Sequence, residues 1–213
     1  MNIKVKDTDI AFRKWKVKDR DAFVNAQNDY DRRQALVYNC LENKTIALDN
    51  EQYNYVLIQI RCESVSPMLH YTLRCPECGS VLDVDVDLRE IVHVRYQDFH
   101  DIVIPGLKIT LAEVKNREAY ERRMSETQDT YNKYLIDLAF HINTINDAYP
   151  QSFNGVVEFI RDLDVDQFEN IFRQWDTQRF KVLMNGDLTC SNCGITTKWN
   201  FDDLPGFLPA SWL

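Results

Sequence analysis

Two pairs of cysteines have the spacing of metal ligands. Cys75 and Cys78 form one CxxC motif, Cys190 and Cys193 form the other, and a glycine follows each motif directly. A CxxC turn presents two thiolates to one ion, and zinc favours four such soft ligands in a tetrahedron. The glycine allows the backbone to turn sharply with a positive φ. We therefore predict that the two motifs together bind one Zn²⁺ ion.

This ligand set favours a structural metal over a catalytic one. Four cysteines close the coordination shell and leave no position for water or substrate. The alternative is a redox-active CxxC, which needs a helix directly after the motif. Residues 81–88 instead alternate apolar and polar side chains, as a strand does. His70 could replace a cysteine as a ligand or lie near the metal, but its place on a predicted strand favours an exposed side chain.

The segments around the two motifs repeat each other weakly. Each motif lies between two short extended stretches, and each unit ends in Asp-Leu, at residues 87–88 and 203–204. Two strand–turn–strand units that face each other make a zinc ribbon. The sequence thus predicts a zinc ribbon that is split between residues 69–88 and 187–204.

The remaining segments predict an α+β fold in which a long insertion interrupts the ribbon. Residues 1–68 predict a strand pair followed by helices, one of them capped by Asp49. Residues 89–186 predict a β-hairpin that turns at Pro105-Gly106 and then a large, mostly helical insertion. We expect all these parts to form one integrated domain.

The individual elements follow from periodicity and from helix-start signals. The expected strands lie at residues 3–5, 12–17, 91–95 and 102–111. The first expected helix is capped by Asp19 or Asp21 and runs to residue 26. The others lie at residues 31–42, 49–61, 112–127, 129–145, 154–162 and 164–183. Asp164 and Gln167 form a capping pair for the last helix.

Residues 205–213 form an apolar C-terminal tail. Its two prolines, at positions 205 and 209, exclude a helix. The tail either packs as a strap on the body or docks on a partner protein. In the second case the partner-binding anchors would be the large apolar side chains, Phe207, Leu208 and Trp212.

Composition and charge limit the partners of the chain. Its 213 residues carry a net charge of −8. Nucleic-acid binding needs clustered Lys and Arg, whereas acidic residues crowd near the cysteine motifs, which argues against a nucleic-acid partner.

No apolar run approaches the roughly 18 residues of a membrane-spanning helix, and the N-terminus lacks the apolar core of a secretory signal. We expect no membrane contact.

The two cysteines outside the motifs are Cys40 and Cys62. Both lie in apolar helical stretches, which favours buried thiols over a disulfide. All six cysteines of the chain therefore fit a reducing cytosol.

Motifs that would indicate catalysis are missing from the sequence. It contains no dinucleotide-binding or phosphate-binding glycine motif, no HExxH and no GxSxG, and its histidines are scattered. Asp83 and Asp85 form a DxD pattern, but a solvated strand face explains it better because nothing else converges on them. We expect a non-enzyme without a small-molecule substrate.

Two features carry a family resemblance: the sequence LIQIRCESV at residues 57–65 and the paired cysteine motifs. With the order of strands and helices around them, nearly the whole chain resembles the baseplate hub assembly protein family of T-even-type contractile-tailed bacteriophages. The resemblance implies a structural component or an assembly chaperone that contacts other phage baseplate or hub proteins. It also implies synthesis in the host bacterial cytoplasm and, for a structural component, a place in the virion tail baseplate.

Two other functions remain open on the residues alone. A zinc-ribbon nucleic-acid-binding regulator would use the basic run Arg-Lys-Trp-Lys at residues 13–16, although a half-exposed strand explains this run more simply. An enzyme with a helical insertion in a ribbon scaffold would need a pocket with converging acids. The sequence neither indicates nor excludes such a pocket.

Overall fold

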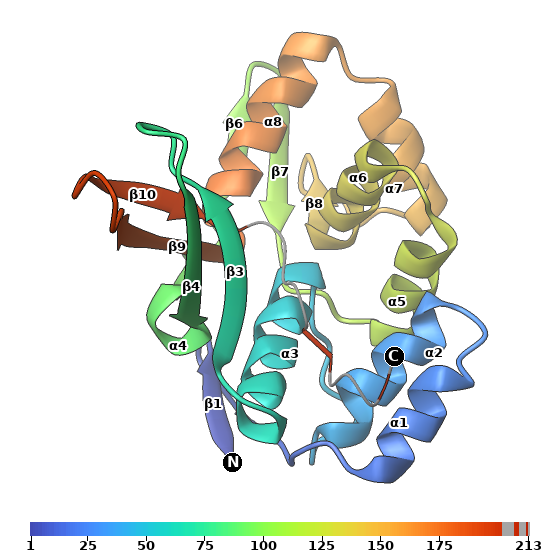
Figure 1. The fold of residues 1–213 in the computed structure, drawn as a ribbon. Coiled ribbons are helices and arrows are strands. Elements are labelled where there is room, and N and C mark those ends of the chain that lie inside the picture. The colour runs from blue at the N-terminus through green and yellow to red at the C-terminus, as the bar shows by residue number, and fades with distance from the viewer. Residues whose placement is uncertain (202–206, 209–211, 213) are drawn as a thin grey trace.

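A computed structural model describes residues 1–201, 207, 208 and 212 of the chain. The fold is mixed α+β, as predicted. Most helices gather on one side, and the two cysteine-bearing hairpins project from the other (Figure 1). The strands within the described residues form four small antiparallel sheets rather than one large sheet.

The N-terminal part starts with a β-hairpin, in which β1 (Asn2–Val5) pairs with β2 (Thr8–Ala11). The prediction of a strand at residues 12–17 is wrong. Phe12 makes a single bridge, to Leu41, and the chain then enters a helix. No strand continues through residue 17 because the side chain of Asp19, in the first turn of that helix, accepts a hydrogen bond from the backbone amide of Lys16. This bond caps the helix.

Helices follow the hairpin. They are α1 (Val17–Val24), α2 (Asp29–Leu36), the short 3₁₀ helix η1 (Tyr38–Cys40) and α3 (Asn50–Ser64). Asp49 caps α3, as predicted. Its carboxylate accepts from the backbone amide of Gln52 at 2.8 Å, and the Gln52 side chain accepts from the Asp49 amide at 3.1 Å. This reciprocal pair fixes the orientation of Asp49.

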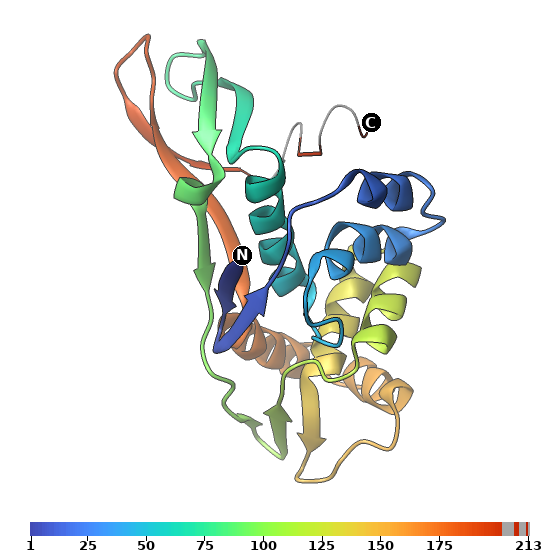
Figure 2. The same cartoon turned by 90° about the horizontal axis from the view of Figure 1, so that it is seen from below.

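The two cysteine motifs lie at the tips of two antiparallel hairpins. The first consists of β3 (Met68–Arg74) and β4 (Val81–Asp87), and the second of β9 (Lys181–Thr189) and β10 (Thr196–Asn200). Both hairpins extend away from the helices in the two views (Figures 1 and 2). The second hairpin begins at Lys181, earlier than the predicted start at residue 187.

The predicted pairing of residues 91–95 with the next strand is wrong. A short helix, α4 (Leu88–Ile91), leads into β5 (Val92–Arg95), and β5 pairs with β9. The predicted turn at Pro105-Gly106 joins only β6 (Ile102–Ile104) to β7 (Leu107–Leu111). The long strand β9 thus has β10 on one side and β5 on the other.

The insertion is mostly helical, as predicted. Its helices are α5 (Arg117–Glu126), α6 (Thr130–His141), α7 (Phe153–Arg161) and α8 (Val165–Gln178). Asp164 and Gln167 form the predicted capping box of α8.

The prediction of a helix through residue 145 is wrong at its end. Residues Ile142–Ile145 form β8, which pairs with β7. Three of these four residues are β-branched and favour a strand once a partner strand is present. The hydroxyls of Thr110 and Thr144 are 2.7 Å apart across this pair. Helical periodicity in the sequence did not reveal the partner strand.

Three main clusters of buried apolar side chains hold the described residues together. One packs the N-terminal hairpin against α2 and α3, and another packs β6, β7 and β8 against α6, α7 and α8. A third fills the base of the two cysteine hairpins. Segments far apart in sequence share these clusters, since Phe180 belongs to the first and Phe201 to the third. Among the described residues, no helix has the length and apolar character needed to cross a membrane.

Candidate metal centre

The first CxxC motif forms a tight turn at the tip of the β3–β4 hairpin. The backbone amide of Cys75 donates to the carbonyl of Ser80 at 2.9 Å, and the amide of Gly79 donates to the carbonyl of Cys75 at 2.9 Å. Gly79 has a φ of 73°, in the left-handed region that favours glycine. These bonds direct Cys75 and Cys78 to the same side of the turn.

The second motif has the same hydrogen-bond pattern. The amide of Cys190 donates to the carbonyl of Ile195 at 2.9 Å, and the amide of Gly194 donates to the carbonyl of Cys190 at 2.8 Å. Gly194 also has a φ of 73°. The weak repeat in the sequence therefore corresponds to two turns with equivalent backbone geometry.

The two turns bring the four cysteines together. The sulfur of Cys75 lies 3.9 Å from that of Cys193, and the sulfur of Cys78 lies 3.7 Å from that of Cys190. All four sulfurs lie within 4.8 Å of one another. A disulfide would need about 2.05 Å. A tetrahedral ion with metal–sulfur bonds of about 2.3 Å has sulfurs about 3.8 Å apart. The four cysteines can thus bind one metal ion.

The electrostatics of the cluster also favour a bound cation. Hydrogen bonds from Ser80 lower the pKa of the Cys78 thiol to about 6. A backbone hydrogen bond at Ile195 lowers the pKa of Cys193, but burial and the neighbouring thiols outweigh it and raise that pKa to about 12. Four adjacent thiols resist full ionisation because the thiolates repel one another. A metal ion removes this repulsion.

Two residues that the sequence analysis missed support the cysteines. The hydroxyl of Ser80 lies 3.0 Å from the sulfur of Cys78 and 3.4 Å from that of Cys190. The side-chain amide of Asn192 donates to the sulfur of Cys78 at 3.6 Å. Such polar contacts orient ligands and stabilise thiolates. Their signal in the sequence is only their position: Asn192 lies within the second motif, and Ser80 follows the glycine of the first.

His70 is placed on the strand surface, as the sequence favoured. Its side chain is 63% exposed, and its Nδ1 lies 3.0 Å from a carboxylate oxygen of Asp85. Asp83 accepts a hydrogen bond from Thr72 at 2.7 Å across the hairpin. These side chains pair across the hairpin on the solvent face, and His70 is not part of the four-cysteine cluster.

The three proposed anchors of the C-terminal tail pack on the chain itself. Trp212 is buried, and its ring lies 5.1 Å from that of Trp15. Leu208 packs against the same N-terminal cluster. Phe207 packs at the base of the cysteine hairpins, and its carbonyl accepts from the guanidinium of Arg61 at 3.3 Å. These contacts are those of a strap, and docking on a partner would require their release. The other tail residues lie outside the described residues.

One comparison with known proteins identifies a family. The model of the T4 bacteriophage base plate protein family matches residues 1–209. No curated protein and no solved structure gives a significant match. The family match spans both cysteine motifs, the N-terminal part and the helical insertion. The chain therefore belongs to the T4 bacteriophage base plate protein family.

Proposed function

We propose that this baseplate protein acts in the hub, the central part of the baseplate, and works by contact with other baseplate proteins. The observation that carries the proposal is the family match over residues 1–209. The sequence LIQIRCESV, which resembles hub assembly proteins, covers the second half of α3 and residue 65, at the junction between the N-terminal part and the first cysteine hairpin. The protein would be made in the host bacterial cytoplasm, as a structural component or as an assembly chaperone.

The proposal includes a structural Zn²⁺ ion at Cys75, Cys78, Cys190 and Cys193. Four thiolates with sulfur spacings of 3.7 and 3.9 Å fit a tetrahedral zinc site. The ion would join the tips of two hairpins that lie far apart in sequence. Its chemistry would be structural, since four cysteines complete the coordination shell.

The surface of the cysteine hairpins suits contact with another protein. Both tips project from the body (Figure 2). Val81 and Ile195, which follow the two motifs, are 56% and 45% exposed. Exposed Asp83 and Asp85 lie on the same hairpin as Val81 and would repel the phosphates of a nucleic acid. This charge supports a protein partner over the alternative of a nucleic-acid-binding regulator.

A role by contact rather than catalysis is also part of the proposal. Acidic groups with raised pKa values often indicate active sites. Here buried Glu121 is bonded to Arg33 and Tyr38, and buried Asp137 is bonded to Tyr120 and Arg179. Burial raises the pKa of both carboxyls, so the shifts have a structural cause.

The test is co-purification with the hub proteins of the same phage after co-expression. We expect the wild-type chain to form a complex, and a Val81→Asp/Ile195→Asp variant to lose it because the exposed apolar tips become charged. Val165→Asp is the matched control, because Val165 is 71% exposed at the start of α8, outside the two hairpins. Capture by wild type and by both variants alike would contradict a role for the hairpin tips. Absence of any complex would contradict the hub proposal.

Mass spectrometry of purified virions then separates the two hub roles. A structural component stays in the mature tail, whereas an assembly chaperone is present in infected cells and missing from virions.

A further inference from the structure

A second group of potential metal ligands lies inside the body, far from the cysteines in the sequence. It consists of Asp49, Glu113 and His141, whose ligand atoms all lie within 4.8 Å of one another. Asp49 precedes α3, Glu113 lies between β7 and α5, and His141 ends α6. Three separate segments therefore converge at this point.

His141 has the hydrogen bonding of a histidine prepared to bind a metal. Its Nδ1 donates to the backbone carbonyl of Asp137 at 2.7 Å, which places a proton on Nδ1 and leaves Nε2 as the ring nitrogen available to a ligand. The residue is 1% exposed, and its buried Nε2 has no hydrogen-bond partner. Metal-binding histidines almost always donate their other ring N–H to a carbonyl or carboxylate in this way.

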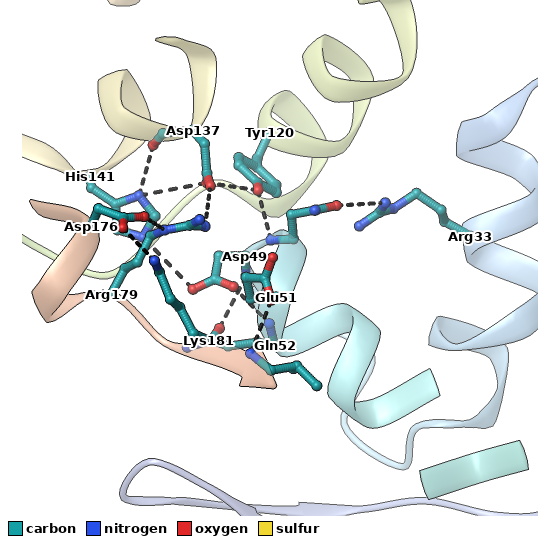
Figure 3. Close-up of polar contacts among 12 residues, drawn as sticks. Arg33, Asp49, Glu51, Gln52, Tyr120, Asp137, His141, Asp176, Arg179 and Lys181 are labelled. Carbon is teal, nitrogen blue, oxygen red and sulfur yellow. Dashed lines mark hydrogen bonds and ion pairs between the residues drawn. The ribbon is translucent and has the colours of Figure 1, made fainter. Parts of the chain in front are cut away.

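The unpartnered nitrogen of His141 faces a carboxylate. Figure 3 shows Asp49, Asp137 and His141 converging, and the Oδ2 atom of Asp49 lies 3.9 Å from Nε2. This separation is too long for a hydrogen bond. A lone pair on Nε2 would be repelled by this carboxylate, and either a proton on Nε2 or a metal ion between the two atoms offsets that repulsion. The geometry therefore leaves a place for a positive ion.

Gln52 holds the two carboxylates in position. Its backbone amide donates to Oδ1 of Asp49, which leaves Oδ2 directed at His141. Its side-chain amide donates to Oε2 of Glu113 at 3.4 Å. One residue in the first turn of α3 thus orients both acidic ligands, as supporting residues do at metal sites.

The surrounding charges leave the site net negative. Asp137 is balanced by Arg179 at 3.4 Å and by the hydroxyl of Tyr120 at 2.9 Å. Lys6 pairs with Glu113 and is the cation nearest to the two ligand carboxylates among the contacts of the described residues. One ammonium group therefore faces two carboxylates, and the remaining negative charge attracts either a proton on His141 or a metal ion.

We propose that Asp49, Glu113 and His141 bind a divalent transition-metal ion, with Zn²⁺ as the best fit to one imidazole and two carboxylates. Zinc bonds of about 2.1 Å would bring the ligand atoms to about 3.4 Å from one another. Glu113 is exposed and lies outside helices and strands, so it can make most of this movement. The ion fastens α3, α6 and the segment after β7 together.

A cavity of about 230 Å³ reaches one of the three ligands, because Glu113 lines it together with Gln52 and Phe99 among others. It gives the ion a route for entry and exchange. This site differs from the four-cysteine cluster in its oxygen and nitrogen donors.

The experiment is titration of the full chain with Co²⁺, followed by replacement with Zn²⁺ and elemental analysis. Cobalt bound to thiolates gives strong near-ultraviolet charge-transfer absorption, whereas cobalt bound to imidazole and carboxylates does not. We expect about two ions per chain, of which one lacks thiolate absorption. Asp49→Asn should weaken binding of that ion by more than about tenfold and leave the thiolate-bound ion unchanged.

The variants are chosen so that the fold survives. Asparagine caps a helix as well as aspartate does, so Asp49→Asn removes the ligand charge and keeps the cap of α3. Glu113→Gln changes an exposed side chain and should have the same effect on the second ion. Glu118→Gln, at an exposed acid in the first turn of α5, is the matched control and should retain both ions.

The outcomes separate this site from the cysteine site. An ion without thiolate absorption that disappears in Asp49→Asn and Glu113→Gln supports the proposal, whether or not the cysteines bind metal. A chain that binds metal only with thiolate absorption overturns it. Equal binding of the second ion by the control and by both ligand variants also overturns it.

Discussion

Replacing Cys75 by serine tests whether a metal joins the two hairpins. Cys75 and Cys193 are 118 residues apart in sequence. A cross-link over this span stabilises a chain by about 5 kcal/mol through the entropy of the unfolded state. The apolar cluster at the base of the hairpins already holds them together, so the metal would close only the smaller loop between this base and the tips. A loop of roughly 15 residues contributes about 3 kcal/mol, which is the lower estimate. We expect Cys75→Ser to lower the free energy of unfolding by about 3 to 5 kcal/mol.

The assay is urea unfolding combined with measurement of bound metal. With an m-value of about 3 kcal/mol/M, the midpoint should fall by about 1 to 2 M. The variant should also lose the cobalt ion that has thiolate absorption. A chelator should shift wild-type protein to a similar midpoint, because it removes the same cross-link.

The control makes the same chemical change outside the cluster. Cys62 is buried at the base of the hairpins, and Cys62→Ser should keep the thiolate-bound metal. The reasoning is refuted if Cys75→Ser keeps the wild-type metal content and midpoint. It is refuted equally if a strong chelator leaves the wild-type midpoint unchanged.

Two further predictions concern the tail and one buried carboxylate. Trp212→Ala should lower the free energy of unfolding by about 3 kcal/mol, because it removes a buried ring that packs beside Trp15. Urea unfolding measures this change. Loss of partner capture at unchanged stability would instead favour docking of the tail on a partner. Burial raises the pKa of Asp19, but hydrogen bonds from Arg13 and the backbone of Lys16 outweigh it and hold the pKa below 3.8. The stabilisation by this carboxylate is then present above pH 3.8 and lost as the pH falls through the folded-state pKa. The stability difference between wild type and Asp19→Asn should therefore shrink between pH 6 and pH 3, and a difference independent of pH would contradict this.

Features encoded by neighbouring residues could be predicted from the sequence. The CxxC spacing with its following glycine defines the two turns, because their hydrogen bonds join residues at most five apart. The caps of α3 and α8 are equally local, since Asp49 and Asp164 act on residues three positions ahead. The hairpin turn at Pro105-Gly106 follows from the same short-range chemistry.

Strand partners were predicted less well because a partner is a property of the whole fold. Residues 92–95 have the pattern of a strand, but their pairing with β9 joins segments about ninety residues apart. Residues 142–145 continue the apolar pattern of α6, and only the presence of β7 makes them a strand. In both cases the local pattern fits more than one element, and packing selects between them.

The sequence by itself determined the two CxxC turns, the caps and most of the helices, since spacing and periodicity carry this information directly. The tertiary structure alone decided which distant segments meet. It placed the tail anchors on the body, and it brought Asp49, Glu113 and His141 together from three parts of the chain. No local pattern marks those three residues, because each is an ordinary polar residue in the unfolded chain. Only folding buries His141 and places its Nε2 atom opposite the carboxylate of Asp49.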